Sequence, residues 1–92
     1  MATIKVQNGF PELGQNSSGI ILTGILVSGA LNDGDFLVID NETKVSIAKV
    51  EIDDNIFPGV RHIRLFVPEE KKVVWHKLYG NVYETEVPVR SD

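Results

Sequence analysis

Cysteine is absent from this 92-residue chain, and the chain has only two histidines. Without cysteine there is no disulfide framework, no thiolate zinc site and no cysteine nucleophile, and the composition fits a reducing compartment. A catalytic zinc site takes about three protein ligands, so His62 and His76 alone predict no metal. No apolar run approaches the ~20 residues of a membrane helix, and residues 1–3 show no signal-peptide core. We expect no membrane contact and a cytoplasmic location.

Motifs that bind phosphate or activate a nucleophile are also missing. The sequence contains no P-loop, no dinucleotide-binding glycine motif and no nucleophile elbow. Its carboxylate pairs, Asp53-Asp54 and Glu69-Glu70, lie in expected surface segments, away from the low dielectric that catalytic carboxylates need. We predict no catalytic residue, no cofactor and no enzymatic activity. A buried His62 or His76 beside two carboxylates in one cleft would favour an enzyme again.

Basic side chains are few, nine against 13 acidic ones, which gives a net charge of −4. Proteins that bind the phosphate backbone usually carry a basic face that releases counterions. Residues 1–58 hold eight acidic and three basic side chains, whereas residues 59–92 hold five and six. The second region leaves room for a modest basic patch, but we expect no nucleic-acid partner.

Short apolar runs bounded by turn residues make up most of the chain. Hydrophobic residues account for 42% and charged residues for 24%, as in globular proteins, and the length predicts a single domain over residues 1–92. The runs are rich in isoleucine, valine and leucine, which predicts strands. Helical spacing occurs only near residues 69–79, where Val74 and Leu78 are four apart and Gly80 follows. We predict an all-β fold with one short helical segment near residues 69–79.

Several boundaries follow from local patterns. Thr3–Gln7 alternates apolar with polar residues, and Asn8-Gly9 is predicted to end that strand. The apolar phase shifts between Ile47 and Val50, which predicts a β-bulge between them. Asp53–Asn55 is predicted to form an acidic turn.

The richest apolar segment begins with Gly19–Gly29, which predicts a strand. Asn32–Gly34 favours a tight turn, because these residues tolerate the positive φ of hairpin turns, and Phe36–Ile39 then runs back. This pattern predicts a β-hairpin. Gly24 inside the first strand indicates a bend or a close backbone approach.

Glycines in this segment follow the spacing G-x-x-x-T-G-x-x-x-x-G-x-x-x-x-G-D. The residues that carry it are Gly19, Thr23, Gly24, Gly29, Gly34 and Asp35. The spacing resembles the second, β-barrel domain of translational GTPases of the elongation factor Tu type, and the likeness extends over about residues 19–84. It implies a closed six-stranded antiparallel Greek-key-type β-barrel. We expect no GTPase domain before the barrel and therefore no GTP, and Ser17-Ser18-Gly19 in place of the Gly-Arg-Gly of many relatives argues against transfer-RNA binding.

Both faces of the predicted hairpin are apolar. Five side chains are expected to fill the barrel: Ile20, Leu22, Leu26, Leu37 and Ile39. Five others are expected to share its outer face: Ile21, Ile25, Val27, Phe36 and Val38. A wet exterior should alternate with polar residues, so something covers this face. The cover is either the Phe10–Ser18 loop or the C-terminal tail, or else a partner.

A patch of several hundred Å² is the size at which soluble monomers usually have a partner or a cover. We predict a small stand-alone, non-catalytic binding module that uses its apolar outer strand faces for protein contact or self-association, most simply as a homodimer. The alternative is an accessory protein of translation that binds RNA or the aminoacyl end of transfer RNA.

Overall fold

The protein is all-β apart from one short helical turn. The computed structural model describes residues 1–11, 19–68 and 72–88. The elements are β1 (Ala2–Pro11), β2 (Gly19–Gly29), β3 (Phe36–Val38), β4 (Lys44–Ser46), β5 (Lys49–Phe57), β6 (Val60–Pro68), the 3-10 helix η1 (Trp75–Leu78) and β7 (Val82–Glu86). The predicted all-β class and the short helical segment near residues 69–79 are confirmed. Residues 69–71, where that segment was expected to begin, lie outside the described residues.

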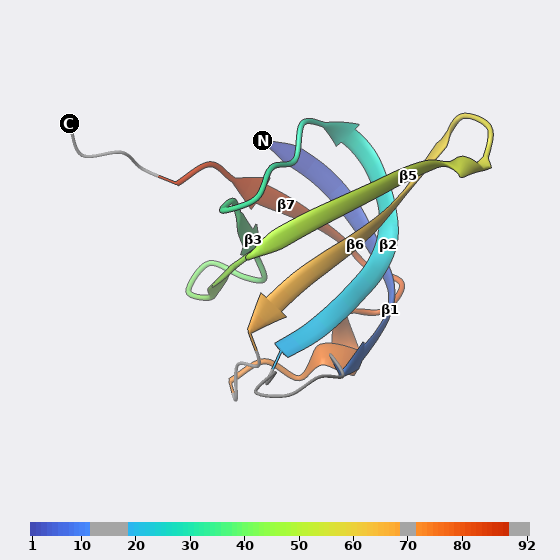
Figure 1. Ribbon diagram of the computed structural model, residues 1–92. Helices are drawn as coiled ribbons and strands as arrows, with labels where there is room; N and C mark the ends of the chain where they lie inside the picture. The colour runs from blue at the N-terminus through green and yellow to red at the C-terminus, as the bar shows by residue number, and fades with distance from the viewer. Residues whose placement is uncertain (12–18, 69–71, 89–92) are drawn as a thin grey trace.

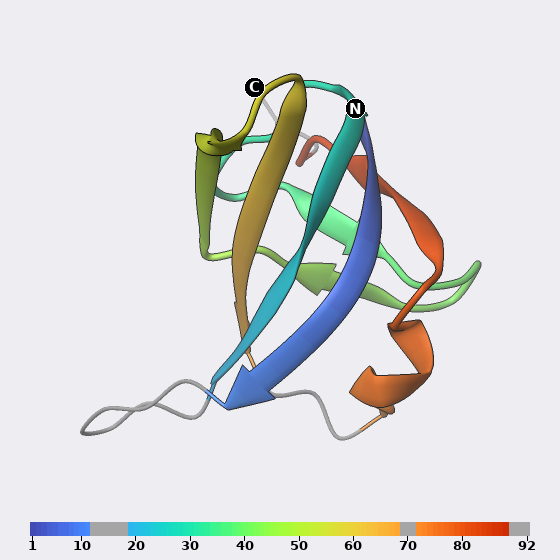
Figure 2. The same cartoon turned by 90° about the vertical axis from the view of Figure 1, so that its right-hand side faces the viewer.

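All seven strands pair antiparallel in one sheet, in the order β4-β3-β7-β1-β2-β6-β5. Figures 1 and 2 show the strands wrapping around a common interior. The two end strands, β4 and β5, are consecutive in the chain. Between them, the Ala48 N–H donates to the Phe66 carbonyl on β6 (2.8 Å), and the Ile47 N–H donates to the Asp35 carbonyl before β3 (2.8 Å). Over the described residues, no ladder joins the two ends of the sheet.

The sheet has seven strands where the resemblance implies six. The additional strand arises at Ile47 and Ala48, because their N–H groups donate to opposite sides of the sheet and interrupt the ladder there. The predicted β-bulge is therefore wrong: β4 ends and β5 begins. Val45 and Ile47 are buried, and Val50 is partly buried against the core, so the apolar phase shift is real.

The predicted hairpin between residues 19 and 40 does not form. The turn itself is present, since the Asp35 N–H donates to the Asn32 carbonyl (3.2 Å) and Gly34 has φ 90°. However, β3 pairs with β4 and β7, and both β7 and β1 lie between β2 and β3. The reason is the connection before the turn, where Leu31 is 7% exposed and packs in the core. Because that leucine is buried, the chain crosses to the other part of the sheet, where β3 pairs with β4 and β7 and not with β2.

Strand β1 continues through Asn8-Gly9, where the sequence predicts an end. The register with β2 shifts between Val6 and Asn8, so the intervening residue, Gln7, forms a β-bulge. Opposite the bulge, a Cβ at Gly24 would overlap the Lys5 carbonyl oxygen. The predicted close backbone approach at Gly24 is confirmed, and the missing side chain is what lets β1 and β2 come together there.

The predicted turn at Asp53–Asn55 is part of strand β5. Asp53 Oδ1 accepts the Asn55 N–H (2.9 Å), and the register with β6 shifts between Asp53 and Phe57. The chain reverses at Pro58-Gly59, where Gly59 has φ 78°. Asp53 thus satisfies a backbone N–H of an irregular strand, and Figure 1 shows the β5–β6 hairpin projecting beyond the rest of the sheet.

The core lies inside the curled sheet. Its largest fully buried apolar side chains are Ile4, Val6, Leu22, Leu37, Ile47 and Leu65. Of the five residues expected to fill the interior, Leu22, Leu26 and Leu37 are buried, whereas Ile20 and Ile39 are only partly buried against the core. The inward half of the predicted alternation is therefore correct.

The 3-10 helix η1 packs against strand β1. Leu78 is buried, and the Tyr79 hydroxyl donates to the Gly9 carbonyl (3.1 Å). Gly80 has φ 84°, the left-handed conformation predicted for the residue that follows the helical segment. Within the described ranges, no helix has both the length and the apolar character needed to cross a membrane.

Candidate interaction surface

The five residues predicted to form one outer patch lie in two places. Ile21 and Ile25 are half-buried on β2, and Phe36 and Val38 are half-buried on β3, each alternating with a buried leucine. Val27 is 57% exposed near the end of β2, beyond the ladder with β6. Because β7 and β1 separate β2 from β3, the expected contiguity is wrong. The residues have to be considered as two separate outer faces.

The outer face of β3 is bordered by polar side chains. Phe36 pairs across the sheet with Ser46 and Glu86. Val38 pairs with Lys44 and Glu84, and the Lys44 ammonium lies 2.7 Å from the Glu86 carboxylate. Apolar and charged side chains alternate here from strand to strand, as expected of a sheet face in water.

The outer face of β2 is bordered by aromatic residues. Ile21 pairs with Phe10 on β1 and with Phe66 on β6. Phe66 pairs in turn with Lys49 on β5, whose ammonium lies 5.5 Å from the centre of the Phe66 ring. Phe10, at 46% exposed, ends the row on the β1 side. These four residues form what we call the apolar row, three apolar side chains with a cation over the last ring.

A second row crosses the same four strands and is polar. It runs from Asn8 through Thr23 and Arg64 to Glu51. The Arg64 Nε lies 3.0 Å from one Glu51 oxygen, and Lys49 lies 3.5 Å from the other. The Thr23 hydroxyl donates to the Asn8 carbonyl (3.4 Å). We call this set the polar row.

A third row is mixed in character. It runs from Lys5 through Ile25 and His62 to Asp53. The other cross-strand neighbour of Lys5 is the exposed Val82 on β7. Neither Lys5 nor Asp53 forms an ion pair with any residue that the structure describes. We call this the mixed row, and the three rows together the β2–β6 face.

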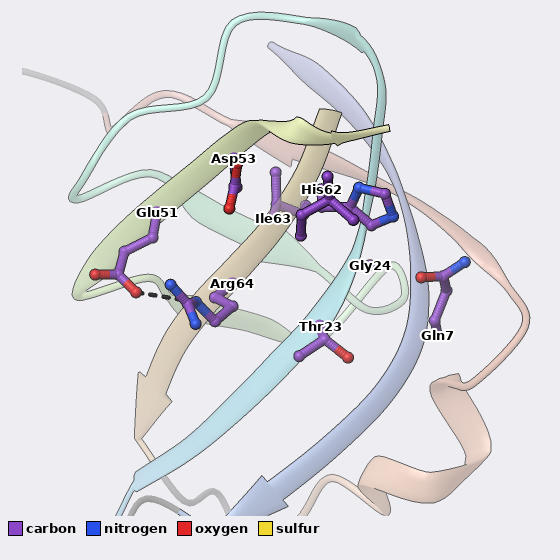
Figure 3. A pocket seen from close by; sticks show the side chains of 9 residues that line it. Gln7, Thr23, Gly24, Glu51, Asp53, His62, Ile63 and Arg64 are labelled. Carbon is purple, nitrogen blue, oxygen red and sulfur yellow. Dashed lines mark ion pairs between the residues drawn. The ribbon is translucent and has the colours of Figure 1, made fainter. Parts of the chain in front are cut away.

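A shallow cavity of about 320 Å³ opens between the polar and mixed rows (Figure 3). Its lining residues are Gln7, Thr23, Gly24, Glu51, Asp53, Ile56, His62, Ile63 and Arg64. Gln7 reaches it because the β1 bulge places two successive residues against one on β2. The volume is at the small end of the ~300–1,000 Å³ typical of ligand sites.

The cavity brings His62 beside two carboxylates, the arrangement that would favour an enzyme. His62 is only half-buried, and its Nδ1 is buried without a hydrogen-bond partner among the described residues. Glu51, however, is already paired with Arg64, and Asp53 accepts the Asn55 N–H. No nucleophile hydrogen-bonded to His62 occurs in the described part of the chain, so this site lacks the geometry of an activated nucleophile. The absence of enzymatic activity stays a prediction.

Metal binding finds no support in these side chains. Among residues 1–11, 19–68 and 72–88, no three histidine, aspartate or glutamate side chains are grouped so as to hold a metal ion. His76 is exposed on η1, far along the chain from the cavity residues. Two possible covers of the outer face were expected from the sequence, the Phe10–Ser18 loop and the C-terminal tail. Residues 12–18 of the loop and residues 89–92 of the tail lie outside the described residues.

Local sequence reasoning identified only two residues of this surface, both on β2. The outward alternation of β2 predicted Ile21 and Ile25, but Phe10, Phe66 and the bulge at Gln7 were missed because they depend on pairings between distant segments. The only local signal was Gly24, which marked the close approach of β1. No family model, no curated protein and no solved structure matches the chain.

Proposed function

We propose that the protein is a non-catalytic interaction module that binds protein through the β2–β6 face and associates with itself as a homodimer. The observation that carries this proposal is the apolar row. Ile21 has aromatic neighbours on both sides on an outward face, where the neighbours of Phe36 and Val38 on the other outer face are polar. Aromatic residues are enriched at the centres of protein interfaces.

We also infer that the sheet is a variant of the closed Greek-key-type barrel found in translation factors. Two observations support this: the end strands are consecutive in the chain, and the Ala48 N–H reaches β6 from the end of β4. Gly29 and Gly34, two glycines of the spacing, both have positive φ, and Gly24 allows the close approach of β1. A role in translation and a cytoplasmic location remain predictions.

Binding of RNA is the alternative function, and the charge of the β2–β6 face argues against it. Two of its basic side chains, Arg64 and Lys49, both contact Glu51, and Asp53 lines the same cavity as Arg64. Phosphate binding draws its affinity from cations that displace counterions, and cations already engaged by a carboxylate contribute less.

A matched pair of variants tests the proposed function. Ile25→Glu replaces an apolar side chain of the β2–β6 face by a carboxylate, which would have to lose its hydration when the face is buried in an interface. Val38→Glu makes the same kind of change on the outer face of β3, between Lys44 and Glu84. We expect light scattering to give a dimer for the wild type and for Val38→Glu, and a monomer for Ile25→Glu. A monomeric wild type at high concentration, or equal loss of the dimer in both variants, would overturn the proposal.

A further inference from the structure

The charges at the two ends of the mixed row are separated within one chain. Lys5 lies on β1 and Asp53 on β5, with β2 and β6 between them. Adjacent strands are about 4.8 Å apart, so the two residues stand roughly 14 Å apart on the same face. That separation is too great for an ion pair within the chain, but it presents a cation at one edge of the face and an anion at the other.

We infer that the face pairs with a second copy of itself about a two-fold axis that runs parallel to the strands, between β2 and β6. The inference rests on the proposed function and specifies its partner. Such an axis keeps each row opposite its own copy and reverses the order of the strands, so that β1 of one chain faces β5 of the other. Lys5 then lies opposite Asp53 of the second copy, twice in the dimer, and the half-buried Ile25 lies opposite His62.

The other two rows are complementary in the same arrangement. In the polar row, Asn8 meets Glu51 and Thr23 meets Arg64, which places an amide opposite a carboxylate and a hydroxyl opposite a guanidinium. In the apolar row, Phe66 packs on Ile21, while Phe10 meets Lys49. Lys49 already lies 5.5 Å from one aromatic ring, and a second ring on its far side extends the cation–π contact.

A second face-to-face arrangement, with its two-fold axis perpendicular to the strands and centred on the polar row, is disfavoured by charge. An axis perpendicular to the strands would place each strand opposite its own copy. Centred on the polar row, it would set Arg64 against Arg64 and Glu51 against Glu51, and like charges facing one another across an interface cost several kcal/mol. The distribution of charge over the face therefore favours the strand-parallel axis over this arrangement.

Charge reversal at the two ends of the mixed row tests this arrangement, with the dimer dissociation constant of the full chain measured by sedimentation equilibrium. Lys5→Asp alone and Asp53→Lys alone each turn two attractive pairs into two repulsive ones, and we expect each to raise the dissociation constant by roughly tenfold or more. Asp54→Lys is the control, because Asp54 adjoins Asp53, is exposed and belongs to none of the three rows. We expect it to leave the dissociation constant within about twofold of the wild type.

Mixing the two weakened variants gives the decisive result. In a heterodimer of Lys5→Asp with Asp53→Lys, both pairs are attractive again, so the equimolar mixture should dimerise within about threefold of the wild type. A defect confined to folding of either chain would not be rescued by the other. Should Asp53→Lys not fold, Asp53→Asn keeps an acceptor for the Asn55 N–H and should still raise the dissociation constant.

The failures of the two proposals can be told apart. A wild-type dimer that Ile25→Glu dissociates, but that neither charge reversal weakens, overturns the strand-parallel arrangement and leaves the proposed function standing. A mixture that dimerises no better than its components overturns the arrangement as well. A monomeric wild type overturns both.

Discussion

The outer faces of β2 and β3 look alike in the sequence and differ in the structure. Each strand alternates a buried leucine with half-buried apolar residues, Ile21 and Ile25 on β2, Phe36 and Val38 on β3. On β3 the strands alongside contribute serine, lysine and glutamate, whereas on β2 they contribute phenylalanine. An apolar outward residue therefore becomes a candidate interface only through the residues that distant strands place beside it.

The largest expected effect is a difference in stability between alanine substitutions at Gly24, beneath the β2–β6 face, and at Gly34, before β3. Gly24→Ala puts a Cβ into the Lys5 carbonyl beneath the β2–β6 face, and β1 must move away from β2 to accommodate it. We expect the free energy of unfolding, measured by urea denaturation, to fall by about 3 kcal/mol or more. Gly34→Ala, in the turn that leads to β3, meets no atom within 4 Å and should cost only the ~1–2 kcal/mol of a left-handed alanine. Equal losses would contradict the close approach.

The next largest expected effect is a difference in dimer affinity between substitutions of two phenylalanines, Phe66 on the β2–β6 face and Phe36 on the outer face of β3. Phe66→Ser removes the centre of the apolar row, and we expect the dimer dissociation constant to rise by about thirtyfold or more, since central aromatic residues commonly contribute ~2 kcal/mol or more to binding. Phe36→Ser, a half-buried phenylalanine on the other face, should change it by less than about threefold. Sedimentation velocity over a dilution series measures both. A larger effect of Phe36→Ser would move the interface to β3.

The smallest expected effect concerns RNA. Two cations of the β2–β6 face, Arg64 and Lys49, already contact Glu51. We therefore expect fluorescently labelled single-stranded RNA to bind at physiological salt no more tightly than the ~10⁻⁴–10⁻⁶ M of non-specific binding. Fluorescence anisotropy provides the measurement. Salt-sensitive binding tighter than about 10⁻⁶ M that is lost in Arg64→Gln would replace protein contact by RNA binding on this face.

The sequence predicted those features that depend on near neighbours in the chain. The all-β class, the inward residues of β2 and β3, the left-handed Gly80 and the close approach at Gly24 all follow from local periodicity or from the special conformations of glycine. These features are short-range, so a single segment carries enough information to specify them.

Strand pairing was beyond the reach of local patterns. The turn predicted at Gly34 is present, but the predicted pairing of β2 with β3 is wrong. The buried Leu31 redirects the chain, and strands from both ends of the sequence insert between β2 and β3. The β1 bulge at Gln7 and the cavity it borders depend on the same non-local pairing. The candidate surface could be predicted only in small part for this reason: Ile21 and Ile25 on β2 were found, and their neighbours on β1, β6 and β5 were not.

The most direct test of the central claim is a methyl NMR spectrum of the wild type followed on dilution. The β2–β6 face carries the methyl groups of Ile21, Ile25 and Thr23, while Val38 reports on the outer face of β3. We predict that the Ile21 and Ile25 methyl resonances shift together as the protein is diluted from millimolar to micromolar concentration, and that those of Val38 do not move. Shifts confined to Val38, or constant spectra at a monomer mass over the whole range, would contradict dimerisation through the β2–β6 face.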